Sequence, residues 1–61
     1  MSPEAIISHM ESPHEEANYL RELAKDSKFN PKEHAEMLQK FSGDSNAEVG
    51  SAAKQLADRA Q

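Results

Sequence analysis

Histidine and carboxylate side chains are the residues of this 61-residue chain whose chemistry could bind a metal ion. Glu11 and His14 have the Glu-x-x-His spacing that places two ligands on one face of a continuous helix. Pro13 interrupts any such helix and also separates His14 from His9. His34 lies with Met37 and Leu38 on the apolar face of an expected helix, where a partly buried, hydrogen-bonded histidine is the usual explanation. Because the chain has no cysteine and no second acid–histidine pair of this spacing, we expect no metal site.

Serine hydroxyls are the other candidate chemistry, because a nucleophilic serine needs a base and an acid that orients the base. Ser8 precedes His9, and Ser51 lies in a helical stretch, but no acidic or oxyanion arrangement is legible around either serine. Gly43 and Gly50 lack the following Lys-Ser or Lys-Thr of a phosphate-binding loop. A chain this short also struggles to enclose a water-excluding pocket. We therefore expect no enzyme activity and no cofactor.

Four clusters of capping residues show where the helices that position these side chains should begin. Each cluster has a hydroxyl or amide acceptor at the N-cap and a carboxylate within the next three residues, which stabilises a helix start. Three clusters also have a proline at the first helical position, where its fixed backbone angle favours the helix. The clusters are Ser2-Pro3-Glu4, Ser12-Pro13-His14-Glu15, Asn30-Pro31-Lys32-Glu33 and Ser45-Asn46-Ala47-Glu48.

Proline and glycine also indicate where the helices end. Pro13 disfavours helical geometry at the residue before it, and Gly43 is suited to a left-handed C-cap. The expected helices span about 3–10, 13–26, 31–42 and 46–60. They predict an all-α chain that forms a single helical mini-domain over residues 1–61. The architecture should be a small three-helix bundle or an α-α repeat-like array, with a short additional N-terminal helix.

A phrase of eight residues recurs every eighteen residues and indicates three similar helices. Its copies start at Pro13, Pro31 and Val49, and each keeps an alanine at its fifth position and a leucine at its eighth. We expect these alanines and leucines to face the core. Gly50, in the third copy, costs about 1 kcal/mol of helix propensity relative to alanine. It is either a simple packing position, which is the favoured explanation, or a site where a neighbouring helix makes a close contact.

The stretch from Phe41 to Leu56 resembles the turn and second helix of a HEAT-type repeat. In that family, an Asp and an Asn or Asp in the turn precede a Val, two alanines and a leucine. A looser likeness runs from Leu23 to Leu38, so the resemblance covers about residues 23–60. It implies an α-α packing unit used for protein binding, without catalytic activity. The matching residues are Asp44, Asn46, Val49, Ala52, Ala53 and Leu56.

The charged residues are unevenly distributed along the chain, whose formal net charge is −4. Residues 1–24 contain five acids and one base, whereas residues 25–61 contain six of each. An acidic front half argues against a nucleic-acid partner, because phosphate binding depends on Lys and Arg. No signal sequence and no apolar stretch approaching ~20 residues is present, so we expect a cytoplasmic protein without a membrane span. The few large apolar residues make a thin core, which favours self-association.

The remaining function class is a protein-interaction module that acts as a small regulator, inhibitor or assembly subunit. We expect the partner to be another protein with a basic surface, or a second copy of the chain. Two surfaces on the first two helices are candidates for the partner site, an acidic face and an apolar seam. The acidic face comprises Glu11, Glu15, Glu16 and Glu22, and the apolar seam comprises Ile6, Ile7, Met10 and Tyr19.

The alternative is a helix-turn-helix DNA-binding protein that uses helices 31–42 and 46–60. The second of these helices offers only Lys54 and Arg59 as basic residues, opposed by Glu48 and Asp58. Base recognition needs Arg, Asn or Gln at the start of the recognition helix, backed by phosphate contacts. Nucleic acid is therefore the less favoured partner.

Overall fold

Residues 1–60, the part of the chain that the structure describes, fold into four α-helices and one short 3₁₀-helix. The computed structural model describes residues 1–60, and this part of the chain contains helices and turns but no β-strand. The expected all-α class, a small bundle with a short additional N-terminal helix, is confirmed. None of the helices within the described residues has the length and apolarity needed to cross a bilayer. The elements are α1 (Pro3–Ser8), α2 (Pro13–Lys25), the 3₁₀-helix η1 (Pro31–His34), α3 (Ala35–Ser42) and α4 (Ala47–Asp58).

The first three helix starts use the caps that the sequence predicts. The Ser2 and Ser12 hydroxyls each accept a hydrogen bond from the backbone N–H three residues later, at 3.1 Å. The Asn30 side chain accepts from the N–H only two residues later, also at 3.1 Å. Each cap satisfies a backbone donor that has no partner inside the helix.

The turn between α3 and α4 differs from the sequence-based expectation at two residues. Asn46, rather than Ser45, caps α4 by accepting a hydrogen bond from the N–H three residues later, at 3.1 Å. The Asp44 carboxylate accepts from the Asn46 N–H at 2.8 Å and so directs the chain into the helix. Gly43 has a φ of −94°, so the expected left-handed C-cap is wrong. The chain instead leaves α3 through a turn in which Asp44 N–H donates to the Phe41 carbonyl at 3.0 Å.

The helices are shorter than expected, and the third begins as a 3₁₀ turn. α1 ends at Ser8, α2 at Lys25 and α4 at Asp58. The tight Asn30 cap favours the 3₁₀ turn, which rotates by about 120° per residue instead of about 100°. This rotation changes the phase of the residues that follow. Ala35 is the first residue of α3 and is exposed, so its expected place in the core is wrong, whereas the equivalent alanines of the other two repeats lie inside α2 and α4 and are fully buried.

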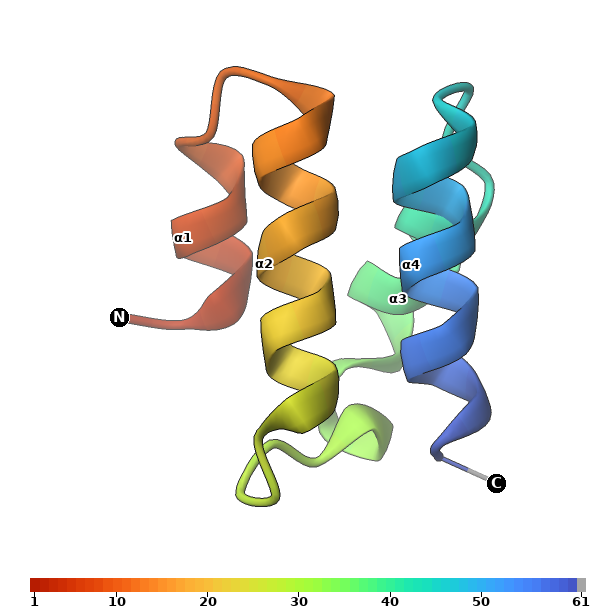
Figure 1. Ribbon diagram of the computed structural model, residues 1–61. Helices are drawn as coiled ribbons and strands as arrows, with labels where there is room; N and C mark the ends of the chain where they lie inside the picture. Colours follow the sequence, from red (N-terminus) through yellow and green to blue (C-terminus); the bar gives the residue numbers. More distant parts are fainter. Residues whose placement is uncertain (61) are drawn as a thin grey trace.

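The core lies between α2, α3 and α4, with α1 against the outer side of α2. Figure 1 shows α1 and α4 on opposite sides of α2, with α3 behind them, and α4 packs against both α2 and α3. The repeat leucines Leu20, Leu38 and Leu56 are buried as expected. α1 contributes one residue to the core, Ile7. The other buried apolar residues are Ala17, Leu23, Phe29, Met37, Val49, Ala52 and Ala53.

Gly50 allows a close contact between α4 and the end of α3, which is the less favoured of the two explanations that the sequence offers. A Cβ atom placed on Gly50 would lie 3.3 Å from the carbonyl oxygen of Ser42 and 3.6 Å from that of Asp44. The first distance is shorter than an ordinary van der Waals contact between carbon and oxygen. The start of α4 is therefore held directly against the backbone of the preceding turn.

Candidate functional site

Residues from α1, α2, η1 and α3 line a groove with a volume of about 840 Å³, which we call the α1–α3 groove. The volume lies in the range of ligand-binding clefts, about 300–1,000 Å³. Three buried or half-buried apolar residues, Ile7, Met37 and Phe41, contribute to its lining. The charged residues that line it are Glu4, Glu16, Glu33, Glu36, Lys32 and Lys40.

Helical spacing explains why α3 presents an apolar strip to the groove. Met37 and Phe41 are four residues apart, so their side chains lie one above the other on the same face. Met37 is 6% exposed, and Phe41 packs half-buried against the core. The Nζ atom of Lys40 lies 5.7 Å from the centroid of the Phe41 ring, which is the distance of a cation–π contact. The apolar floor is thus bordered by charge on its α3 side.

The rim of the α1–α3 groove carries an excess of negative charge. Four of its lining residues are glutamates and two are lysines. Within residues 1–60, the carboxylates of Glu16, Glu33 and Glu36 are outside the ion pairs that the structure contains. These three carboxylates are therefore available to a positively charged group that enters the groove.

The fourth glutamate, Glu4, joins α1 to η1. Its Oε2 atom accepts a hydrogen bond from Nδ1 of His34 at 2.6 Å. The His34 ring also stacks on Phe29, with 4.8 Å between the ring centroids, so it is the partly buried, hydrogen-bonded histidine that the sequence predicts. The hydrogen bond from His34 lowers the pKa of the Glu4 carboxyl below its ordinary value. Burial raises the pKa of the nearby Tyr19 phenol, and the negative charge of Glu4 adds to that rise.

The predicted apolar seam is largely used by the protein itself. Ile7 is 2% exposed, so its side chain belongs to the core rather than to an open surface. Met10 and Tyr19 pack half-buried against the same core, and Ile6 is half-buried. The only large hydrophobic residue that is fully exposed within residues 1–60 is Met1.

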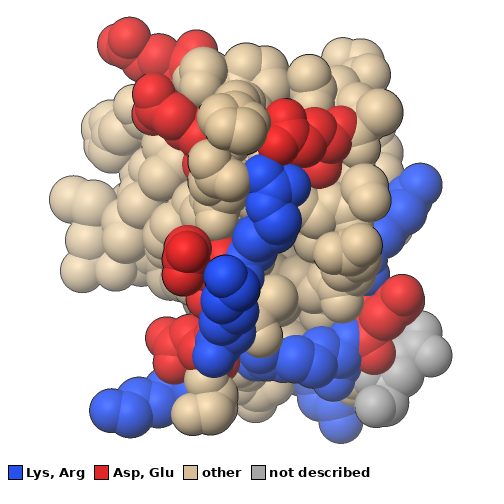
Figure 2. Space-filling view, viewed as in Figure 1, with Lys and Arg blue, Asp and Glu red and all other residues tan. Residues whose placement is uncertain are grey.

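The predicted acidic face is divided between two surfaces. Glu16 lines the α1–α3 groove, whereas Glu11, Glu15 and Glu22 are exposed outside it. Adjacent residues of a helix point about 100° apart, which separates Glu15 from Glu16, while a spacing of seven places Glu15 and Glu22 on the same face. Figure 2 shows acidic and basic side chains interleaved on one side of the molecule instead of a continuous acidic patch.

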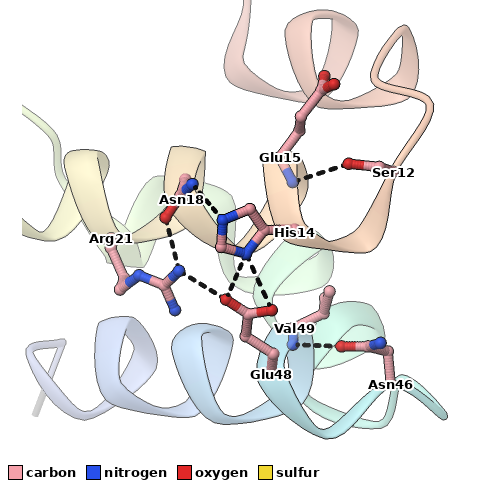
Figure 3. A network of polar contacts seen from close by, with 8 residues as sticks. All are labelled: Ser12, His14, Glu15, Asn18, Arg21, Asn46, Glu48 and Val49. Carbon is pink, nitrogen blue, oxygen red and sulfur yellow. Dashed lines mark hydrogen bonds and ion pairs between the residues drawn. The ribbon is translucent and has the colours of Figure 1, made fainter.

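A polar network that the sequence interpretation missed connects α2 to α4 (Figure 3). His14 Nδ1 donates to the two carboxylate oxygens of Glu48, at 3.2 and 2.9 Å, and Arg21 donates to the same carboxylate at 2.8 Å. Asn18 lies between the two donors, because its amide donates to His14 Nε2 at 3.2 Å and its oxygen accepts from Arg21 at 2.6 Å. The hydrogen bond from Arg21 lowers the pKa of the Glu48 carboxyl, and His14 adds to the effect.

One sequence signal points to this network. His14, Asn18 and Arg21 follow the i, i+4, i+7 spacing of a single polar stripe on α2. The partner Glu48 is not visible from that stripe, because its position depends on how α4 packs against α2. The network crosses between helices and uses its own polar groups, so it acts as a structural clamp.

Arg59 follows directly after α4 and lies against the C-terminal end of α2. Its guanidinium donates hydrogen bonds to the carbonyls of Leu23, Ala24, Asp26 and Phe29, at 3.5 Å for Leu23 and 3.3 Å for Asp26. The Leu23 and Ala24 carbonyls lie in the last turn of α2, and those of Asp26 and Phe29 lie in the loop after it, so Arg59 joins the end of α4 to the end of α2. The Arg59 guanidinium is therefore occupied by hydrogen bonds to the protein's own backbone. Of the two basic residues that the helix-turn-helix alternative would use to contact DNA, this leaves Lys54.

The three histidines do not converge, and no group of three or more His, Cys, Asp or Glu side chains is arranged for a metal ion within residues 1–60. His14 and His34 pair with Glu48 and Glu4, and His9 is exposed at the end of α1. No family model, curated protein or solved structure matches the chain.

Proposed function

We propose that the protein is a small, non-catalytic protein-interaction module that binds a basic, amphipathic segment of a partner protein in the α1–α3 groove. The supporting observation is the combination of an apolar floor with a rim on which glutamates outnumber lysines by two to one. Amphipathic helices bind in such grooves by laying their apolar face on the floor. A regulator, an inhibitor or an assembly subunit would each act through this mode of binding.

Charge favours a basic segment over a second copy of the chain. Opposite charges on a groove rim speed the encounter with a partner and fix its orientation. A second copy carries the same net charge of −4, so it would be repelled. The resemblance of residues 23–60 to a HEAT-type unit agrees with a protein partner, because it implies an α-α unit used for protein binding.

The size of the molecule limits the length of the segment. Its longest dimension is 26 Å. A helix rises 1.5 Å per residue, so a segment of about 17 residues spans the whole molecule. The probe for the experiment is therefore a synthetic 17-residue helical peptide, with leucines along one face and lysines on both flanks of that face.

The experiment measures the affinity of this peptide for the wild-type chain and for two variants at adjacent positions. Glu16→Lys reverses a charge on the groove rim, and we expect it to weaken binding roughly tenfold. Glu15→Lys makes the same change one residue away, outside the groove, and we expect affinity to stay within about twofold of the wild type. Circular dichroism of both variants checks that the helices remain folded.

Three outcomes would contradict the proposal in different ways. Equal losses in both variants would assign binding to the outer face of α2, and no loss in either would exclude the groove. A peptide with glutamine in place of every lysine that binds as tightly would show that the partner is not basic. Sedimentation of the chain alone over a hundredfold concentration range tests the second-copy alternative, since a dimer disrupted by Glu16→Lys would place another copy in the groove.

A further inference from the structure

α1 is held to the rest of the protein by very few contacts. Of its six residues, one, Ile7, is buried. Within residues 1–60, its side chains make one hydrogen-bonded contact with another element, the pair of Glu4 with His34 at 2.6 Å. A helix of six residues is too short to be stable alone in water. α1 therefore stays helical only while it is docked, and the Glu4–His34 pair is the polar contact that docks it beside the burial of Ile7.

We propose that the Glu4–His34 pair is a protonation-dependent latch that holds α1 as one wall of the α1–α3 groove, more firmly near pH 6 than near pH 8. Histidine is the side chain that ordinarily exchanges a proton between pH 5 and 8. An imidazolium attracts the Glu4 carboxylate by charge as well as through the hydrogen bond from Nδ1. A neutral ring keeps the hydrogen bond and loses the charge, so the contact weakens without vanishing.

The charged groups that share the groove with His34 come from four elements. They are Glu4 of α1, Glu16 of α2, Lys32 and Glu33 of η1, and Glu36 and Lys40 of α3. The loop before η1 contributes Phe29, whose ring stacks on His34. The carboxylates attract an imidazolium and the ammonium groups repel it. Of these groups, Glu4 is the one that forms an ion pair with the ring among the described residues. Protonation of His34 therefore acts mainly on the attachment of α1.

Opening of the latch changes the α1–α3 groove. The α1 wall of the groove consists of Glu4, Ile7 and Ser8. When α1 detaches, the groove loses this wall. The half-buried His34 and Phe41 then become more accessible from the α1 side. This inference goes beyond the proposed function, because it concerns the chain without any partner and is tested in the absence of peptide.

The experiment is amide hydrogen exchange measured by NMR on the full chain at pH 6 and pH 8, with each rate divided by the intrinsic exchange rate at that pH. The informative amides are those of Ile6, His9 and Met10, which donate to carbonyls within the α1 turn at 3.0–3.2 Å. We expect their protection factors to fall about two- to fivefold from pH 6 to pH 8, which is the range for a partly exposed ion pair. Amides of α4 serve as the internal reference for global stability.

Three variants identify the group that causes the change. Glu4→Gln preserves the shape and the hydrogen-bond acceptor but removes the charge, so the pH dependence of α1 should disappear. Glu33→Gln removes a neighbouring rim carboxylate that is not paired with His34, and the dependence should remain. His9→Gln removes the other histidine at α1, at its C-cap, and most of the dependence should remain.

The latch would be overturned by equal protection of α1 at pH 6 and pH 8 in the wild type. It would also be overturned if Glu4→Gln kept the full dependence, or if His9→Gln abolished it. Because no peptide is present, a negative peptide-binding result leaves this test unaffected, and a failed latch leaves the groove proposal unaffected.

Discussion

The two sides of α2 are held by different means. On the side facing α4, fully buried leucines and small residues pack together, and His14 and Arg21 bridge to Glu48 of α4 at 2.8–3.2 Å. On the other side, α1 is attached by one buried isoleucine and by one ion pair, which joins Glu4 to His34 of η1. The first side has several independent contacts that reinforce one another, whereas the second depends on two.

This difference assigns separate tasks to the two sides. The α2–α4 side provides the stability of a chain that has a small core and no disulfide. The α1 side borders the groove that we propose as the binding site, where a lower stability would permit α1 to move on binding. Binding regions are commonly drawn from the less stable parts of a protein.

The largest expected difference is between two core truncations. Leu20→Ala empties a fully buried site on the α4 side, and we expect it to lower the free energy of unfolding by about 2–5 kcal/mol. Ile7→Ala truncates a residue that is also buried, but α1 can detach while the rest of the bundle stays folded. The loss in the free energy of unfolding therefore cannot exceed the free energy with which α1 docks. We expect a loss below that of Leu20→Ala in urea unfolding followed by circular dichroism.

The single tyrosine of the chain gives Ile7→Ala a second readout. Burial and the charge of Glu4 raise the pKa of Tyr19, so detachment of α1 should return it toward its ordinary value of about 10. Ultraviolet absorbance at high pH measures this titration. A loss of stability as large as that of Leu20→Ala, with an unchanged Tyr19 pKa, would show that α1 is an integral part of the bundle.

The two glycines offer an intermediate effect that tests how tightly the bundle interior is packed. Alanine favours a helix by about 1 kcal/mol over glycine, yet a Cβ on Gly50 would lie 3.3 Å from the Ser42 carbonyl oxygen. We expect Gly50→Ala to destabilise the protein by about 1 kcal/mol. The added Cβ would press on a backbone oxygen, and the backbones of α4 and of the end of α3 cannot easily move apart. Thermal unfolding of the purified variant measures the change.

Gly43→Ala is the matched control for that substitution. A Cβ on Gly43 would lie 3.8 Å from the Lys40 carbonyl oxygen, an ordinary contact, and its φ of −94° suits alanine. We expect it to stabilise the protein by about 0.4–1 kcal/mol by restricting the unfolded chain. A stabilising Gly50→Ala would mean that α4 and the turn before it can move apart, and the interior would be looser than its geometry indicates.

The parts of the fold that were predictable from the sequence depend on neighbours along the chain. The hydroxyls of Ser2 and Ser12 cap their helices as predicted, since a cap involves only the next few residues. The repeat phrase correctly predicts burial of Leu38 but not exposure of Ala35, because it assumes an α-helix that starts at Pro31, whereas the 3₁₀ turn makes Ala35 the first residue of α3.

The candidate site was only partly predictable, because its contacts join distant segments. Glu16 and Ile7 were predicted as partner-binding residues and line the groove. The pairing of Glu4 with His34 spans thirty residues of sequence, and Arg59 reaches carbonyls more than thirty residues away. Such contacts depend on how the helices pack, which local patterns do not encode. Helix spacing does divide the predicted acidic face, and that division could have been derived from the sequence.

The smallest expected effect compares two carboxylates in acid. The pKa of Glu48, on the α4 side, and that of Glu4, on the α1 side, are both lowered from an ordinary value of 4.5. A lowered pKa means that the folded state favours the ionised form, so the stabilisation is complete above pH 4.5 and is lost as the pH falls through the lowered value. Wild-type stability should therefore decline below about pH 4.5.

The position of each carboxylate determines which measurement records its contribution. Glu48 bridges helices that separate only in global unfolding, so Glu48→Gln should flatten the acid decline of the urea midpoint between pH 6 and pH 3. Glu4 ties down a helix that opens first, so Glu4→Gln should leave that curve close to the wild type and flatten the acid decline in α1 amide protection instead. If Glu4→Gln changes the global curve as much as Glu48→Gln does, α1 unfolds together with the bundle. The two sides of α2 would then form one cooperative unit, and the groove would have no movable wall.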